Sequence, residues 1–127
     1  MYTITRTFGP ICAQHAISRL PEGHGCRNMH GHNFYVHIIL EAKRLNEFGM
    51  VIDFTELDAL DSYLRSWPRL ERGLNALFDD HDPTVEHLAE HVARWASKHL
   101  DLGGSRVACV RVAETDTCWS EYIPEPA

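Results

Sequence analysis

Apolar and polar residues alternate in four stretches of the chain, two near its beginning and two near its end. Alternation with a period of two is typical of a strand that buries one face. In the second stretch, for example, Phe34, Val36 and Ile38 share one face. We predict strands at residues 11–15, 33–43, 106–114 and 118–123.

The middle of the chain shows helical spacing instead. Within residues 52–67, Leu57, Leu60 and Leu64 fall on one stripe, and Pro68 would end the helix. Either Asp53 or Thr55 would cap its start.

A second helix is predicted from Thr84 to the glycine pair at 103–104, with Thr84 as its N-cap. The segment before it, residues 69–82, has no clear period, and we expect its acidic DDHD turn to be solvated. The order is therefore ββααββ. It predicts an α+β fold, a four-stranded antiparallel sheet with two helices on one face, as a single domain over residues 1–127.

Composition narrows the functional classes. The net charge is −6 and no Lys/Arg cluster is present, which argues against nucleic acid or an anionic membrane as the main partner. No apolar run approaches the ~20 residues of a membrane helix, and the N-terminus lacks the layout of a signal peptide. We expect a cytoplasmic protein in which the four widely spaced cysteines form no disulfides.

Nine histidines are many for 127 residues, and two of them stand in the motif HGH. At strand spacing, His30 and His32 point to the same face. His15 ends an alternating segment and could supply a third imidazole from a neighbouring strand. Three neutral imidazoles with an open fourth position would suit catalytic zinc, although an HxH pair on the surface is also common.

Two further groups leave alternatives open. Cys26 could close the metal site as a fourth ligand, or stand beside it as a proton-transfer group. His87 and His91, at i and i+4 on a helix, could chelate a metal themselves. We favour a solvated helix face for this second pair.

The segment from His15 to Phe34 contains a histidine, then PEGH, then CRNMHGH. This pattern resembles the signature of the 6-pyruvoyl-tetrahydropterin synthase family, which includes the 6-carboxy-tetrahydropterin synthases of queuosine and deazapurine biosynthesis. The resemblance covers nearly the whole chain. Its other matching segments are GMVIDF at 49–54, Leu74-Asn75, Pro83-Thr84 and Glu114-Thr115.

The resemblance implies a T-fold. In this fold the barrel closes only when subunits associate into a trimer, and two trimers stack into a hexamer. It implies a pterin-like small-molecule ligand and Zn²⁺ as the cofactor. The implied zinc ligands are His15, His30 and His32. Glu114 and Thr84 would contact the pterin, and Cys26 would be the catalytic proton-transfer thiolate. Glu114 could otherwise be a surface residue, and Thr84 could serve only as a helix cap.

One element of the family pattern is missing. An Asp-His pair is expected shortly before Leu74-Asn75, but Leu70-Glu71 or, with a gap, Glu71-Arg72 stands there. Arg stays protonated, and Glu has a reference pKa about two units below that of His. His81, which has neighbouring carboxylates, is a less favoured replacement.

Three hypotheses follow. We favour a family homologue that binds a pterin-like substrate at a zinc site, with weak or absent triphosphate elimination. The alternatives are an active zinc-dependent lyase acting on dihydroneopterin triphosphate, and a non-catalytic T-fold interaction module.

Overall fold

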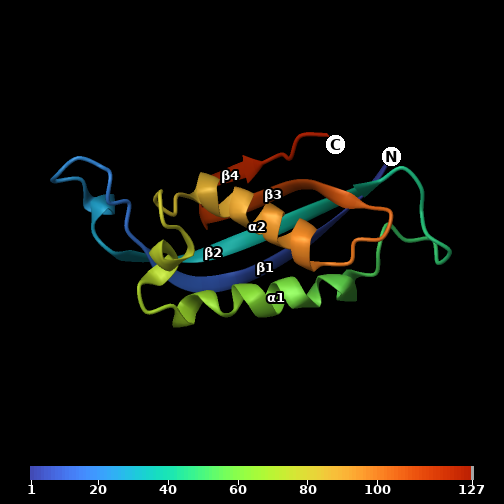
Figure 1. Cartoon of the computed structure of the whole chain (residues 1–127), viewed down its shortest axis with the longest axis horizontal. Coiled ribbons are helices and arrows are strands. Elements are labelled where there is room, and N and C mark those ends of the chain that lie inside the picture. Colours follow the sequence, from blue (N-terminus) through green and yellow to red (C-terminus); the bar gives the residue numbers. More distant parts are fainter. Residues whose placement is uncertain (127) are drawn as a thin grey trace.

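The computed structural model describes residues 1–126 and contains one antiparallel sheet with two helices against one of its faces (Figure 1). Spatial and sequence orders of the strands are the same. The strands are β1 Tyr2–His15, β2 His30–Ala42, β3 Arg106–Thr115 and β4 Cys118–Tyr122, and the helices are α1 Asp58–Leu64 and α2 Val85–His99. The predicted α+β class and the ββααββ order are confirmed.

Two predicted elements differ most from the observed limits. The first strand begins at Tyr2 rather than near residue 11, and the first helix is shorter than residues 52–67. Short 3₁₀ turns flank α1 at Phe54–Leu57 and Trp67–Arg69. Asp53 caps the first of these turns, since its carboxylate accepts from the Thr55 N–H at 2.9 Å.

The length of β1 was missed for a physical reason. Arg6 occupies a position facing the helices, where the alternating pattern would call for an apolar residue. Its guanidinium donates to the Phe54 carbonyl at 2.9 Å and pairs with Asp58 at 2.7 Å, so it ties β1 to the start of α1. The register of β1 against β2 also shifts between Phe8 and Ile11.

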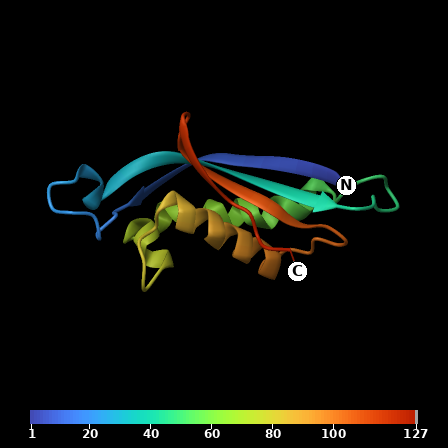
Figure 2. The ribbon, with the colours of Figure 1, turned by 90° about the horizontal axis from the view of Figure 1, so that it is seen from above.

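The core lies between the sheet and the helices, which occupy the same side of it in the edge-on view of Figure 2. The predicted apolar faces supply it. Fully buried members include Phe34, Val36, Ile38 and Leu40 of β2, Leu60 and Leu64 of α1, Leu88 and Val92 of α2, and Val110 and Val112 of β3.

The sheet does not close on itself within the chain. Among residues 1–126, β1 pairs only with β2, and β4 pairs only with β3, so each leaves one edge without a strand partner. The end of β1, the start of β2 and the end of β3 lie together at the end of the sheet away from both chain termini (Figure 1).

Candidate metal and ligand site

Three histidines converge at that end of the sheet. His15, the last residue of β1, pairs in register with His30, the first residue of β2, and His32 follows on the same face. Their ring centroids are 4.5, 5.0 and 5.3 Å apart, and one ligand atom from each lies within 4.8 Å of the other two. Antiparallel pairing thus brings together the predicted ligands from two strands.

Backbone carbonyls orient two of these rings. The Nδ1 atom of His15 lies 2.8 Å from the Pro83 carbonyl oxygen, and that of His30 lies 2.7 Å from the Asn28 carbonyl oxygen. An Nδ1–H that donates to a carbonyl leaves the Nε2 lone pair available, which is the usual arrangement of histidines that bind metals.

The residues present fit a zinc ion. His15 is 1% exposed, and in the part of the chain that the structure describes the buried Nε2 atoms of His15 and His32 have no hydrogen-bond partner. Buried polar atoms are rarely left unsatisfied, and a bound ion is one recognised explanation. Imidazole nitrogens are also ligands that zinc prefers.

Burial lowers the pKa of the His15 imidazole. The neighbouring His30 and His32 lower it further, while the Pro83 carbonyl and Glu114 act in the opposite direction. The neutral form is therefore favoured at His15, and it is the form that can bind a metal.

Glu114 lies at the edge of this group. It is near the end of β3, on the helix-facing side, and its Oε1 atom is 3.2 Å from the His32 Nε2 atom. The geometry of this contact is not that of a hydrogen bond, so the His32 Nε2 atom has no hydrogen-bond partner within residues 1–126. The carboxylate is 28% exposed, which leaves it accessible to a ligand beside the histidines.

Cys26 and Thr84 have different positions relative to the histidines. Cys26 is half-buried in a 3₁₀ turn of the long loop after β1, and the structure does not bring its Sγ atom into the group of three ligand atoms. Thr84 is the N-cap of α2, because its hydroxyl accepts from the His87 N–H at 3.1 Å. It directly follows Pro83, whose carbonyl holds His15.

Asp82 holds the loops of the site together, and the sequence did not reveal this. Its carboxylate accepts from the Ser18 hydroxyl at 2.8 Å and from the Arg19 N–H at 2.9 Å. Burial opposes its ionisation, but these hydrogen bonds outweigh burial and keep the pKa below its ordinary value. Asp82 is only 7% exposed, so the expectation that the whole DDHD turn is solvated was wrong.

A second anchor joins the 3₁₀ turn Gly73–Leu77 to the end of β1. The Asn75 side chain accepts from the Ala16 N–H and donates to the Ala16 carbonyl, both at 2.9 Å. Gly73 has φ +62°, and a Cβ atom added to it would lie 2.5 Å from the Gln14 carbonyl oxygen. A glycine is required where the two backbones approach so closely.

The residues that stand in place of the missing Asp-His pair are exposed. Glu71 and Arg72 precede Gly73 and point away from the core. His81 does have a carboxylate partner, since its Nδ1 atom lies 2.7 Å from Asp80. However, the ring of His81 packs against Phe78 and His87, at centroid distances of 4.5 and 4.0 Å.

His87 and His91 do not form a solvated pair. Both are half-buried, and the His91 Nε2 atom is 2.5 Å from the Tyr63 hydroxyl of α1. Burial lowers the pKa of His91. The helix-face interpretation was therefore wrong, and the chelating alternative is also disfavoured because the Nε2 atom of His91 is bonded to Tyr63.

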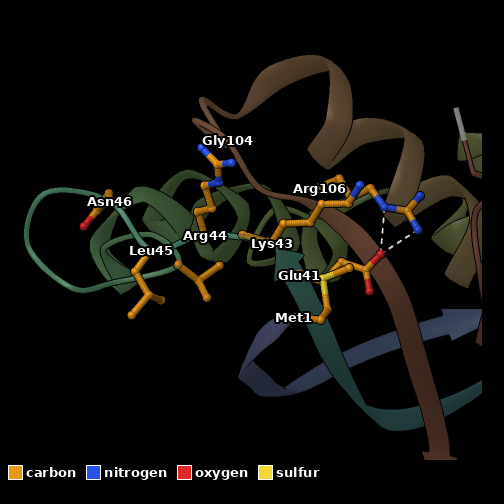
Figure 3. Close-up of a pocket in the computed structure, with 10 residues that line it drawn as sticks. Met1, Glu41, Lys43, Arg44, Leu45, Asn46, Gly104 and Arg106 are labelled. Atoms are coloured by element: carbon orange, nitrogen blue, oxygen red, sulfur yellow. Dashed lines mark hydrogen bonds and ion pairs between the residues drawn. The ribbon is translucent and has the colours of Figure 1, made fainter.

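A surface cavity of about 610 Å³ lies at the opposite end of the strands and is shown in Figure 3. Lys43, Arg44 and Arg106 are among its lining residues, and Arg106 is paired with Glu41. None of the predicted site residues lines it.

No helix within residues 1–126 is both long enough and apolar enough to cross a membrane.

Known proteins resemble this chain over most of its length. Residues 3–125 match the family model described as 6-pyruvoyl tetrahydropterin synthase. The 6-carboxy-5,6,7,8-tetrahydropterin synthase of Bacillus subtilis is 27% identical over 129 residues, which cover 91% of this chain and 81% of the relative. The protein of the same name from Helicobacter pylori is 24% identical over 142 residues, covering 93% and 71%.

The solved structure of Caenorhabditis elegans 6-pyruvoyl tetrahydropterin synthase has a TM-score of 0.79 to this chain, at 21% identity, and the match covers 98% of this chain and 96% of that one. At this identity the similarity shows a shared fold. It confirms the predicted T-fold.

Proposed function

Because the chain belongs to the 6-pyruvoyl tetrahydropterin synthase family, we propose that it binds a pterin-like heterocycle beside a zinc ion held by His15, His30 and His32. The observation that carries this proposal is the pair of buried Nε2 atoms, on His15 and His32, that have no hydrogen-bond partner within residues 1–126. Zinc at this position would polarise a hydroxyl or carbonyl oxygen of the ligand.

Glu114 is the proposed anchor for the heterocycle. A carboxylate can accept two parallel N–H bonds, and the 2-amino and N3 groups of a pterin offer two such donors side by side. The 3.2 Å contact with His32 would place the ligand next to the metal site. Thr84, at the cap of α2, is proposed to contact the ligand through the part of its hydroxyl that the cap leaves free.

Proton transfer is where this chain differs from the family pattern. We assign the transfer role to Cys26, which is half-buried in the loop after β1. No Asp-His pair precedes Gly73, and the exposed Glu71 and Arg72 are poor substitutes near neutral pH. Standard triphosphate elimination from dihydroneopterin triphosphate is therefore expected to be weak.

The proposed assembly is a homo-oligomer, as trimers that stack into a hexamer. In the sheet order β1-β2-β3-β4, each strand is antiparallel to its neighbour, so β4 of one copy and β1 of the next can pair antiparallel as well. Such pairing would cover both unpaired edges, which natural sheets otherwise protect from uncontrolled association.

The test combines metal content, ligand binding and turnover. Protein purified without chelators is analysed for zinc, then mixed with dihydroneopterin triphosphate while bound pterin and released triphosphate are measured. We expect zinc and pterin binding, little release, and loss of pterin binding in Glu114→Gln. Glu125→Gln, an exposed substitution of the same kind, is the matched control.

The other outcomes separate the alternatives. Rapid triphosphate release that is lost in Cys26→Ala would favour the active lyase, for which the HGH motif, Cys26 and Glu114 are all present. Absence of both zinc and pterin binding would favour the non-catalytic module.

A further inference from the structure

We propose that His81 and His87 form a second site for a divalent transition-metal ion, separate from the group of His15, His30 and His32. Their ring centroids lie 4.0 Å apart. The closest pair of the first group, His15 and His30, is separated by 4.5 Å. The two rings come from different elements, since His81 is in the loop after the Gly73–Leu77 turn and His87 is in the first turns of α2.

Each ring is held through its Nδ1 atom. The Nδ1 of His81 lies 2.7 Å from the Asp80 carboxylate, and the Nδ1 of His87 lies 2.8 Å from the Asp82 carbonyl oxygen. A carboxylate or a carbonyl on the other ring nitrogen is what fixes metal-binding histidines in their ligand orientation. The hydrogen bonds found within residues 1–126 leave the Nε2 atom of both rings free.

The local charge favours a cation. Asp79 and Asp80 are exposed in the same turn, and the chain carries a net charge of −6. The nearest guanidinium in the hydrogen-bond network, that of Arg19, donates to the Asp80 carbonyl and lies 3.6 Å from the Asp82 carboxylate. Its charge is therefore matched by Asp82, while the Asp79 and Asp80 carboxylates contribute further negative charge.

The ligand set selects the class of metal. Imidazole pairs suit Zn²⁺, Ni²⁺ and Cu²⁺, with Cu²⁺ bound most tightly, whereas Mg²⁺ and Ca²⁺ prefer oxygen ligands. The His81 side chain is 38% exposed, so water can complete the coordination and the ion can enter from solvent. His91 is excluded because its Nε2 atom is bonded to Tyr63.

The first experiment measures stoichiometry. Metal-free protein is titrated with Zn²⁺ alone by calorimetry, because Cu²⁺ would displace Zn²⁺ from imidazole ligands. We expect a tighter and a weaker Zn²⁺ site per chain, and the affinity of the weaker site should fall at least ~10-fold in His81→Ala and in His87→Ala. His99→Ala is the matched control, because His99 is exposed on the same helix and contacts Trp95.

A second readout does not depend on the variants. In nuclear magnetic resonance spectra of the wild-type protein, the imidazole signals of His81 and His87 should shift with the second equivalent of Zn²⁺. Unshifted His81 and His87 signals after two equivalents, or unchanged affinities in both variants, would each overturn the proposal. The result is independent of pterin binding, so it stands or falls separately from the proposed function.

Discussion

The molecule contains two groups of three histidines, and they differ in what holds each ring. His15, His30 and His32 come from two paired strands, and one ring nitrogen of each lies within 4.8 Å of the other two. The second group, His81, His87 and His91, surrounds Phe78 near the start of α2. There the Nε2 atom of His91 is hydrogen-bonded to the Tyr63 hydroxyl, whereas the hydrogen bonds within residues 1–126 leave the Nε2 atoms of His81 and His87 free.

The difference teaches that histidine spacing alone does not define a metal site. Spacing of i and i+4 on α2 brings His87 and His91 near each other, yet a tyrosine from α1 takes one of the nitrogens. In the strand group, by contrast, the two Nδ1 contacts go to backbone carbonyls, so the Nε2 atoms stay available. The two cases therefore differ in which ring nitrogen is hydrogen-bonded, since it is Nδ1 in His15 and His30 but Nε2 in His91.

The largest expected effect comes from breaking the strand group. His30→Ala removes one of the three imidazoles. We expect zinc affinity to fall by more than ~100-fold, because losing a ligand costs more than losing a group that only hydrogen-bonds a ligand. His91→Ala is the matched change in the helix group and should leave the affinity unchanged. Competition with a chromogenic chelator measures both, and equal affinities in the two variants would show that the groups do not differ in this way.

A smaller effect is expected from Asp82, which lies between the two groups. The carbonyl of Asp82 holds His87, the next carbonyl, of Pro83, holds His15, and the Asp82 side chain ties both to the loop at Ser18. Asp82→Ala should lower the free energy of unfolding by about 1–3 kcal/mol, because it leaves partly buried donors unpaired. It should also weaken zinc binding ~10-fold, which is the usual effect of losing a group that helps to orient a metal ligand.

Two controls accompany this prediction. Asp82→Asn keeps one acceptor oxygen and should lose less stability than Asp82→Ala. Glu86→Ala removes an exposed carboxylate from the first turn of α2 and should change neither quantity appreciably. Urea unfolding and chelator competition measure the two effects, and a fully stable Asp82→Ala with normal zinc affinity would show that the anchor is unimportant.

Much of the fold could be predicted because burial imposes regular patterns. The face of Phe34, Val36 and Ile38 and the leucine stripe of α1 are apolar at the spacing that their elements require. The pairing of His15 with His30 could be anticipated for the same reason, since strand period fixes the face on which each imidazole lies. The beginning of β1 could not be predicted because Arg6 interrupts the apolar alternation.

The supporting contacts of the site could not be predicted in this way. The histidine rings are oriented by the backbone carbonyls of Pro83 and Asn28. Every residue type has a backbone carbonyl, so no side-chain pattern marks these two. Asp82 stands in a run of acids, where solvated carboxylates are the usual case, and only the tertiary approach of the Ser18 loop makes it a buried anchor. The contact between His81 and His87 likewise depends on how the loop folds back onto α2.

The smallest expected effect concerns the pH dependence of the tyrosine contact in the helix group. Burial keeps the pKa of His91 below its ordinary value, so the folded protein holds this ring neutral. The unfolded chain takes up a proton there as the pH falls below about 6.5. The unfolded state then binds more protons, and the free energy of unfolding must fall as the pH drops from about 6.5 towards the lowered pKa.

His91→Gln removes this titration while keeping a polar side chain that can accept from Tyr63. His15 and His37 also have lowered pKa values, mainly through burial, so the wild-type protein loses stability in acid for several reasons. The difference in the free energy of unfolding between wild type and variant isolates His91. As the pH falls from about 8 to about 5, this difference should shrink by up to about 1.4 kcal/mol for each unit of pKa shift.

Tyr63→Phe, which removes the hydroxyl, should lower the free energy of unfolding by about 1 kcal/mol near pH 8, where His91 is neutral in both states. Urea unfolding at about pH 5 and about pH 8 measures both variants. A difference between wild type and His91→Gln that is the same at both pH values would show that His91 does not titrate as the buried contact requires.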